Sequence, residues 1–277
     1  MIGIGKNLFK ANVKAGAAAP TYDADALAYF TANTAITSDA DKNAINTFYL
    51  GLKSDGIYTK IKAMYLPIWG SAAACKWNLV NPVDTNAAFR LTFSTGWTFS
   101  SGGMTPLNAY ATTFLQPNTN FNTTDYNHLS FYSGTSTSIV DDYVMGALQA
   151  GKANLMIIRD TSNFCGFYAD YNTATYRQCS LNTNTDGRGF YVGTQNGTSI
   201  KIFKNNTLLA QNTGVSISGT PPIYSIVIGA VNSSGTPTAY SNKQCRFASI
   251  GTKLSDTEAT NFYTRVNTLM TYFGINV

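Results

Sequence analysis

The chain has 277 residues, of which 44% are hydrophobic, 13% aromatic and only 12% charged, and its formal net charge is +5. It contains one glutamate, Glu258, and one histidine, His128, so most side chains that carry acid–base and metal chemistry near neutral pH are missing. This composition argues against most catalytic centres and favours binding or structural roles in a β-rich protein that can bury a single large core.

The first twenty residues form a basic segment rich in Ala and Gly. Lys6, Lys10 and Lys14 all precede the first acidic residue, Asp23, and Phe9 is the only aromatic side chain of the segment. Residues 1–20 hold too few large apolar side chains to bury themselves. A disordered terminus is one interpretation. We favour an arm that becomes ordered against a neighbouring subunit or assembly, with these lysines and Phe9 as partner-binding residues.

The rest of the chain is nearly neutral. Removing the three lysines of the arm from 19 basic residues leaves 16, against 14 acidic residues. This balance argues against a nucleic-acid groove, which requires clustered Lys and Arg. No apolar run approaches the ~18 residues of a membrane span, and the lysines of the arm interrupt any signal-peptide core. We therefore expect no nucleic-acid partner and no membrane partner.

Two helices are predicted after the arm. The first has Asp23 as its cap and continues to Phe30, and the second begins at Thr37 or Ser38 and ends before Gly56. The apolar residues of the second helix recur at helical spacing, and they are Ala44, Ile45, Phe48, Tyr49 and Leu52. Residues 23–61 are thus expected to be a helical lead-in.

From about Trp69 to Tyr240 the pattern changes to short runs rich in Val, Ile, Phe, Tyr and Thr, separated by Gly, Asn, Ser and Pro. No run is followed by a helix-length crossover, so we predict an all-β dominated fold in which residues 62–250 form an antiparallel two-sheet jelly-roll sandwich. The clearest hairpin turns at Asn205 and Asn206. The predicted strands are Phe89–Ser94, Leu129–Ser133, Tyr143–Leu148, Leu155–Arg159, Phe164–Tyr168, Gly189–Gln195, Ser199–Lys204, Leu208–Asn212, Ile223–Ala230 and Arg246–Ile250.

Residues 255–273 are predicted to form a C-terminal helix on the sandwich. Ser255 is in position to cap it, and Glu258 stands where a capping box places its glutamate. The only glutamate of the chain is therefore interpreted as a structural cap. One apolar stripe is expected to face the sandwich, and it consists of Ala259, Phe262, Tyr263, Val266, Leu269, Met270 and Phe273.

No pattern typical of catalysis is found, so no catalytic residue is predicted. Glycoside hydrolysis requires two carboxylates across the scissile bond. The only adjacent acidic pair, Asp141 and Asp142, would point to opposite faces of a strand, and we interpret it as a solvated strand edge or turn. A Gly-x-Ser-x-Gly motif is absent, and His128 has no evident partner, which predicts a satisfied or exposed structural histidine.

The cysteines do not follow a metal-binding or redox pattern. No C-x-x-C spacing occurs among Cys75, Cys165, Cys179 and Cys245. Free Cys is among the most buried residue types, so we favour buried free thiols over a Cys165–Cys179 disulfide.

No metal or other cofactor is predicted, although Ca²⁺ is kept as a minor alternative. Asp160, Asp170 and Asp186 lie near predicted strand ends among many asparagines, and such oxygens can bind Ca²⁺. No loop has the spacing of an EF-hand.

Several stretches resemble known families. A first set is similar to concanavalin A-like, laminin G-like jelly rolls, and it comprises Ile200–Leu209, Ile226–Asn232, Tyr240–Lys243 and Phe247–Glu258. A second set resembles a module of virion proteins from phages of Bacteroidota, including crAss-like phages, and it comprises Ile57–Pro67, Lys76–Pro82, Asp84–Trp97 and Asn108–Ala111. The stretches follow one another in a common order, and the resemblance spans residues 22–277.

The resemblance implies a structural or surface protein of the virion. Because no catalytic pattern is found, we expect this protein to be non-enzymatic and associated with the capsid or the tail. Other virion proteins are then its partners, and a homo-oligomer is an option. The alternative is a receptor-recognition protein that binds host surface polysaccharide, in which Trp97, Tyr110 or Tyr126 would stack on sugar rings. The competing interpretation of Trp69, Trp77 and Trp97 is core packing.

Overall fold

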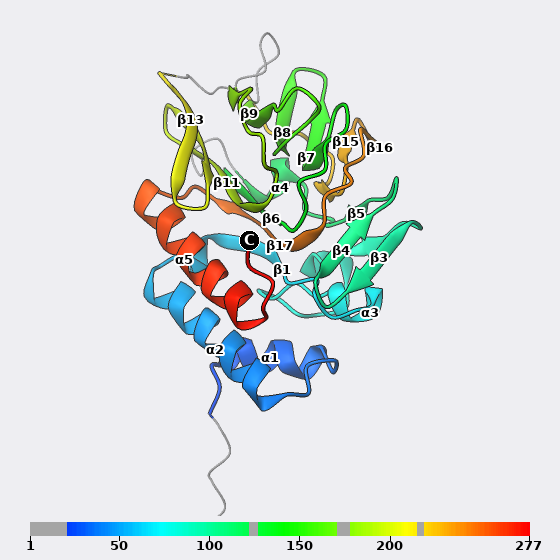
Figure 1. Cartoon of the computed structure of the whole chain (residues 1–277), viewed down its shortest axis with the longest axis vertical. Coiled ribbons are helices and arrows are strands. Elements are labelled where there is room, and N and C mark those ends of the chain that lie inside the picture. Colours follow the sequence, from blue (N-terminus) through cyan, green and yellow to red (C-terminus); the bar gives the residue numbers. More distant parts are fainter. Residues whose placement is uncertain (1–20, 122–126, 171–177, 215–218) are drawn as a thin grey trace, which may run out of the picture.

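The structure is a computed structural model, and it describes residues 21–121, 127–170, 178–214 and 219–277. Two β-sheets are stacked, and helices cover the outer face of one of them (Figure 1). Sheet A has the strand order β13-β12-β11-β6-β17-β4-β3, and β1 also pairs with β17. Its strands are β1 (Ile61–Tyr65), β3 (Trp97–Ser100), β4 (Gly103–Pro106), β6 (Asn127–Ser133), β11 (Gly189–Asn196), β12 (Ser199–Lys204), β13 (Thr207–Thr213) and β17 (Cys245–Thr252).

Sheet B has the strand order β10-β9-β8-β7-β14-β5-β2, and a β15–β16 hairpin lies beside β7. Within the described residues, its strand pairs are antiparallel except for β15 with β7. The predicted antiparallel jelly-roll sandwich is therefore confirmed. The strands of sheet B are β2 (Thr92–Phe93), β5 (Ala111–Thr112), β7 (Tyr143–Gln149), β8 (Lys152–Ile157), β9 (Cys165–Asp170), β10 (Gln178–Leu181), β14 (Val227–Ile228), β15 (Val231–Ser233) and β16 (Thr236–Thr238).

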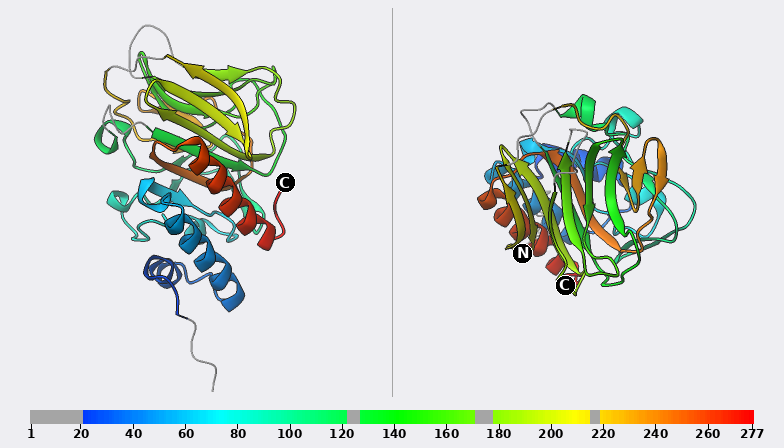
Figure 2. Two further views of the ribbon diagram at one scale, coloured as in Figure 1. Left: turned by 90° about the vertical axis from the view of Figure 1, so that its left-hand side faces the viewer. Right: turned by 90° about the horizontal axis from the view of Figure 1, so that it is seen from above.

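Five α-helices are described, and the three longer ones form a layer on sheet A. Figure 2 shows α5 and α2 next to the sheet, with α1 beyond them. Two single turns of 3₁₀ helix, at Tyr58–Lys60 and Asn86–Ala88, complete the helical structure of the described chain. The α-helices are α1 (Ala24–Ala32), α2 (Asp39–Ser54), α3 (Ala72–Cys75), α4 (Pro117–Asn120) and α5 (Asp256–Tyr272).

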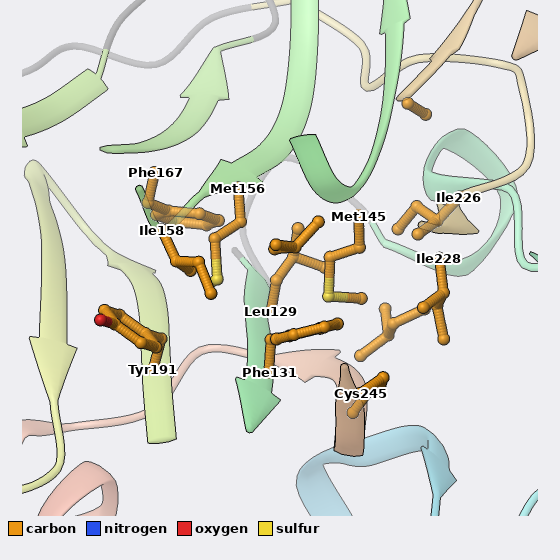
Figure 3. Close-up of a cluster of buried hydrophobic side chains, with 14 of the residues drawn as sticks. Leu129, Phe131, Met145, Met156, Ile158, Phe167, Tyr191, Ile226, Ile228 and Cys245 are labelled. Atoms are coloured by element: carbon orange, nitrogen blue, oxygen red, sulfur yellow. The ribbon is translucent and has the colours of Figure 1, made fainter. Parts of the chain in front are cut away.

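A buried apolar cluster fills the space between the two sheets. Successive side chains of a strand point to opposite faces, so alternate residues of β6 face sheet B. Figure 3 shows Leu129 and Phe131 of β6 meeting Met145 and Met156 of sheet B, and all four are almost completely buried. Gly193 of β11 leaves room for the opposing layer, because a Cβ there would lie 2.3 Å from the Phe167 ring.

The second face of sheet A is buried beneath the helices. Phe262 of α5 makes edge-to-face contacts with Phe190 and Phe247, at ring-centroid distances of 5.2 and 5.8 Å. Phe48 of α2 contacts Phe247 in the same way at 5.9 Å. Because sheet A is covered on both faces, all residues of β6 are buried, including its polar ones. A continuously buried strand of this kind has no clean apolar–polar alternation.

The helix ends agree with the sequence signals. Ser38 accepts a hydrogen bond from the Asp41 backbone N–H and caps α2, and Gly56 follows that helix with φ +70°, a conformation that favours glycine. Ser255 and Glu258 form the predicted capping box of α5. The core of the predicted stripe is buried, with Val266 completely shielded from solvent. These predictions are confirmed.

Several predicted strands differ in length from the observed ones. The Phe89–Ser94 run yields only β2, because Phe89 has φ 60° and ends a 3₁₀ turn. Ile223–Ala230 yields only β14. β1 begins at Ile61, within the expected helical lead-in. The strands that the sequence pattern missed altogether are short, and they are β1, β3, β4, β5, β10, β15 and β16.

All four cysteines are buried and free, as predicted. Cys179 of β10 is in register with Phe167 of β9, and Cys165 is in register with Leu181, so the two thiols are not opposite each other. Burial raises the pKa of Cys179 to about 12, which keeps its thiol protonated at neutral pH.

Candidate binding surface

Two of the three predicted glycan-contacting residues, Trp97 and Tyr110, lie at one edge of the sandwich. The Trp97 indole N–H donates to the Tyr110 carbonyl oxygen at 3.1 Å. The Trp97 ring also packs edge-to-face on Phe93 and is stacked with Phe99. Tyr126, the third predicted residue, lies outside the described residues, as do all the predicted partner-binding residues of the arm.

The aromatic cluster closes the core at the margin of the two sheets. Phe93 belongs to β2, the edge strand of sheet B, whereas Trp97 and Phe99 belong to β3, the edge strand of sheet A. All three rings are partly buried and pack against the inter-sheet cluster. A Cβ at Gly229 would lie 3.0 Å from the Trp97 ring, so the ring packs closely against the backbone of Gly229. At least part of the Trp97 ring therefore packs against the core, as the competing interpretation of this residue expected.

Two adjoining depressions border the short helix α3, and the first of them is lined in part by Phe93. The first has a volume of about 240 Å³, and its lining residues are Ala72, Ala73, Lys76, Arg90, Leu91, Thr92 and Phe93. The second has a volume of about 340 Å³, and its lining residues are Ala32, Asn33, Thr34, Ala35, Ser71, Ala73, Ala74, Lys76 and Trp77. Because both share Ala73 and Lys76, we treat them as one surface and call it the α3 groove.

Hydrogen bonds to the backbone hold together the segments beside the α3 groove. Asn78 is buried, and its side-chain oxygen accepts from the backbone N–H of Met64 and of Val80, both at 3.0 Å. Its amide nitrogen donates to the Ala88 carbonyl oxygen at 3.0 Å. The Leu91 N–H donates to the Lys76 carbonyl oxygen at 2.8 Å. These bonds join the two segments that supply the groove's charged side chains, so the groove is part of the rigid fold.

The charges of the α3 groove are two cations and one shared anion. Lys76 Nζ lies 2.5 Å from Asp84 Oδ2, and an Arg90 guanidinium nitrogen lies 3.2 Å from Asp84 Oδ1. The hydrogen bond from Lys76 is the main cause that holds the pKa of Asp84 below its usual value. Lys76 Nζ also lies 4.7 Å from the centroid of the Trp77 ring. Aromatic rings and hydrogen-bonding groups thus meet in one shallow surface.

His128 is structural, as predicted, and lies outside this groove. One ring nitrogen, Nδ1, contacts the Thr252 carbonyl oxygen at 2.6 Å, and Nε2 contacts Ser249 Oγ at 3.1 Å. These partners fit a neutral imidazole that donates through Nδ1 and accepts at Nε2. The side chain is completely buried, and burial lowers its pKa to about 4. Substrate has no access to this histidine, in spite of the adjacent serine.

The interpretation of Asp141 and Asp142 as a solvated pair is half wrong. Asp141 is exposed and has φ 52°, as expected in a turn. Asp142 is completely buried, and its carboxylate forms an ion pair with the equally buried Lys243. The sequence could not reveal this partner, which lies 101 residues away along the chain.

Of the three aspartates considered for Ca²⁺, Asp160 and Asp186 have other partners, and the side chain of Asp170 is not among those that the structure describes. Asp160 Oδ1 accepts from the backbone N–H of Ser162 at 2.7 Å and of Phe164 at 2.9 Å. Asp186 pairs with Arg188 at 2.9 Å. Among the residues that the structure describes, no three His, Cys, Asp or Glu side chains gather in a way that could hold a metal ion. In the same part of the chain, no helix combines the length and apolar character of a membrane span.

No family model matches the sequence, and no curated protein matches it. Solved structures do match the fold. The binding domain of botulinum neurotoxin serotype D superposes with a TM-score of 0.51 at 11% identity, covering 76% of this chain and 52% of that structure. The receptor-binding domain of the botulinum neurotoxin C/D mosaic serotype gives a TM-score of 0.51 at 12% identity, covering 75% and 52%.

A third match is the binding domain of botulinum neurotoxin DC in complex with SialylT, with a TM-score of 0.50 at 11% identity, covering 75% of this chain and 52% of that structure. This chain therefore spans about half the length of the structures it resembles. At such low identity, the likeness establishes the lectin-like jelly-roll fold alone.

Proposed function

We propose that the chain is a non-catalytic carbohydrate-binding protein and that the α3 groove is its binding surface. The observation that carries this proposal is that Lys76 lines two adjoining depressions. One of them is lined by half-buried Trp77, and the other by half-buried Phe93 together with Arg90. Sugars combine apolar ring faces with rows of hydroxyl groups, so aromatic rings beside fixed donors suit them. A groove that is open and shallow fits part of a polysaccharide better than a small compact ligand.

The fold supports the same function without specifying the ligand. The matched neurotoxin structures are named as binding domains, and one was solved with SialylT. In our proposal, residues 21–277 form one concanavalin-like domain, and host surface polysaccharide is the partner of its groove. The charged and aromatic residues of the groove come from stretches that also carry the resemblance to virion proteins, namely Lys76–Pro82 and Asp84–Trp97.

Trp77→Ala and Phe93→Ala are each expected to weaken binding to bacterial capsular polysaccharide on the order of tenfold, because each removes one stacking surface. Binding is measured by biolayer interferometry on immobilised polysaccharide. Trp77→Phe keeps a ring and should retain most of the affinity. Tyr272→Ala removes an exposed aromatic ring of α5 outside the groove and serves as the matched control.

Circular dichroism must show that each variant is folded, since Trp77 also packs against the helical core. Equal affinities of the wild-type protein and both folded groove variants would refute the α3 groove as the binding surface.

The second part of our proposal is that the protein belongs to a virion, held to other virion proteins through the arm. The sequence resemblance and the separate basic arm support it. The arm precedes α1, whose start is anchored by the Asp23 N–H donating to Asn46 Oδ1 at 2.7 Å. This hydrogen bond belongs to the folded domain, and in our proposal the arm that precedes it makes the contact with other virion proteins.

Deleting residues 1–20 is expected to leave the melting curve nearly unchanged but to prevent incorporation into particles. The arm contributes its lysines and Phe9 only when an acidic neighbour supplies the missing surface. Incorporation is measured as copy number per purified particle, with a Lys6→Gln/Lys10→Gln/Lys14→Gln variant to separate charge from length. A truncated protein that assembles at the wild-type copy number would show that attachment uses the sandwich or the helices instead.

A further inference from the structure

We infer that the α3 groove selects acidic polysaccharides, with a sugar carboxylate bound between Lys76 and Arg90. This inference rests on the proposed function of the groove and specifies its ligand class. It starts from a local imbalance of charge. Lys76 and Arg90 both line the groove beside α3, whereas their recorded ion-pair partner is the single carboxylate of Asp84.

Neither cation uses all its donors within the described structure. A lysine ammonium has three donors and an arginine guanidinium has five. The recorded polar contacts of Lys76 Nζ are limited to Asp84 Oδ2, and those of the Arg90 guanidinium to Asp84 and Asn86 Oδ1. The side chains of Lys76 and Arg90 are 21% and 30% exposed. A second carboxylate can therefore reach both groups from solvent.

The aromatic rings define which carboxylate fits. Trp77 lies beneath the Lys76 ammonium at 4.7 Å and limits where this charge can move. Phe93 lines the same depression as Arg90 and offers an apolar surface next to the guanidinium. A hexuronic or nonulosonic acid residue has an apolar ring face and a carboxylate on the same ring. Such a residue matches this pairing better than a phosphate or a sulfate ester, which carries its charge on a longer arm.

Asp84 acts as an internal competitor for the sugar carboxylate. It is 49% exposed and occupies donors of both cations. Replacing it by asparagine keeps its approximate shape but changes the formal charge of the three side chains from +1 to +2. An acidic ligand should then bind more tightly, whereas a neutral ligand should not. A variant that improves binding is a strong test, because misfolding cannot imitate it.

The experiment compares a panel of carboxylated bacterial capsular polysaccharides with the same preparations after their carboxyl groups have been reduced to alcohols. We expect the carboxylated forms to bind the wild-type protein at least tenfold more tightly in low salt, with the difference reduced at 0.5 M NaCl. Lys76→Gln and Arg90→Gln should each remove most of this difference, and Lys76→Arg should retain it. Asp84→Asn should increase it severalfold.

The outcomes separate the inference from the function on which it rests. Equal binding of the carboxylated and reduced forms, unaffected by Asp84→Asn, would overturn the acidic specificity and leave a carbohydrate-binding groove in place. Binding of neither form by the folded wild-type protein would overturn both. Selectivity that persists in the folded Lys76→Gln/Arg90→Gln double variant would contradict the assignment to these two residues.

Discussion

Lys243→Met is expected to lower the free energy of unfolding by about 3–5 kcal/mol. Asp142 and Lys243 form an ion pair whose side chains are both 0% exposed, and Lys243 Nζ also donates to the Arg159 carbonyl oxygen at 3.0 Å. Asp142 directly precedes β7 of sheet B, whereas Lys243 lies just before β17 of sheet A. Removing the ammonium leaves the buried Asp142 carboxylate without its counter-charge, at the place where the beginning of β7 in sheet B lies near the beginning of β17 in sheet A. Urea unfolding at pH 7 measures the loss.

Two comparisons isolate the effect of the unpaired charge. The double variant Asp142→Leu/Lys243→Met is expected to recover much of the loss, because apolar side chains of similar size need no counter-charge. Lys201→Met is the matched control, since Lys201 pairs with Asp256 at 2.6 Å where the aspartate is 61% exposed. This surface pair should contribute no more than about 1 kcal/mol. Similar losses in Lys201→Met and Lys243→Met would contradict the prediction.

Acidification from pH 7 to pH 4 is expected to remove about 3 kcal/mol of stability through His128 alone. Burial lowers the pKa of His128 from 6.5 to about 4 in the folded protein. The unfolded chain takes up the proton near pH 6.5, but the folded chain does so only near pH 4. Stability from this group is therefore complete above pH 6.5 and is lost progressively as the pH falls towards 4. Unfolding free energies from urea titrations across this window measure the slope.

His128→Asn is the control, because its amide can still donate to the Thr252 carbonyl oxygen but does not titrate. The variant should be less stable at pH 7, yet its stability should depend less on pH between 6.5 and 4. A carboxylate with a lowered pKa that is not coupled to His128, such as that of Asp55, contributes stability that is lost mainly at lower pH, and it acts equally in both proteins. Parallel pH profiles for the two proteins would show that His128 does not gain a proton on unfolding.

Structural features with local sequence signals could be predicted well. The β12–β13 hairpin has its turn at Asn205, where φ is 56°, and asparagine tolerates this conformation. β12 spans the predicted residues Ser199–Lys204. The capping box of α5 depends on two residues three positions apart, Ser255 and Glu258. In these cases, the interactions that stabilise an element lie within the segment that forms it.

Features that depend on distant segments could not be predicted in the same way. β2 and β5 have two residues each, which is too short for any periodicity to be visible. The α3 groove combines Lys76 with Arg90 and with residues of the loop after α1, and spacing along the chain does not indicate that they meet. Lys76 and Trp77 are adjacent in the sequence, but apart from the family resemblance nothing in their spacing indicated a binding surface. Asp142 looked solvated because the sequence does not show that Lys243 lies against it.

The central position of β17 affects when the protein can fold during translation. β17 lies between β6 and β4 in sheet A and also pairs with β1, although it comes after every other strand in the chain. Until Thr252 has emerged from the ribosome, β1 and β6 lack a shared neighbour, and the apolar faces that α5 covers stay open. Pairings between distant segments form slowly, and exposed strands are prone to aggregate. The nascent polypeptide is therefore expected to need chaperone protection through most of its synthesis, with sheet A closing only at the end.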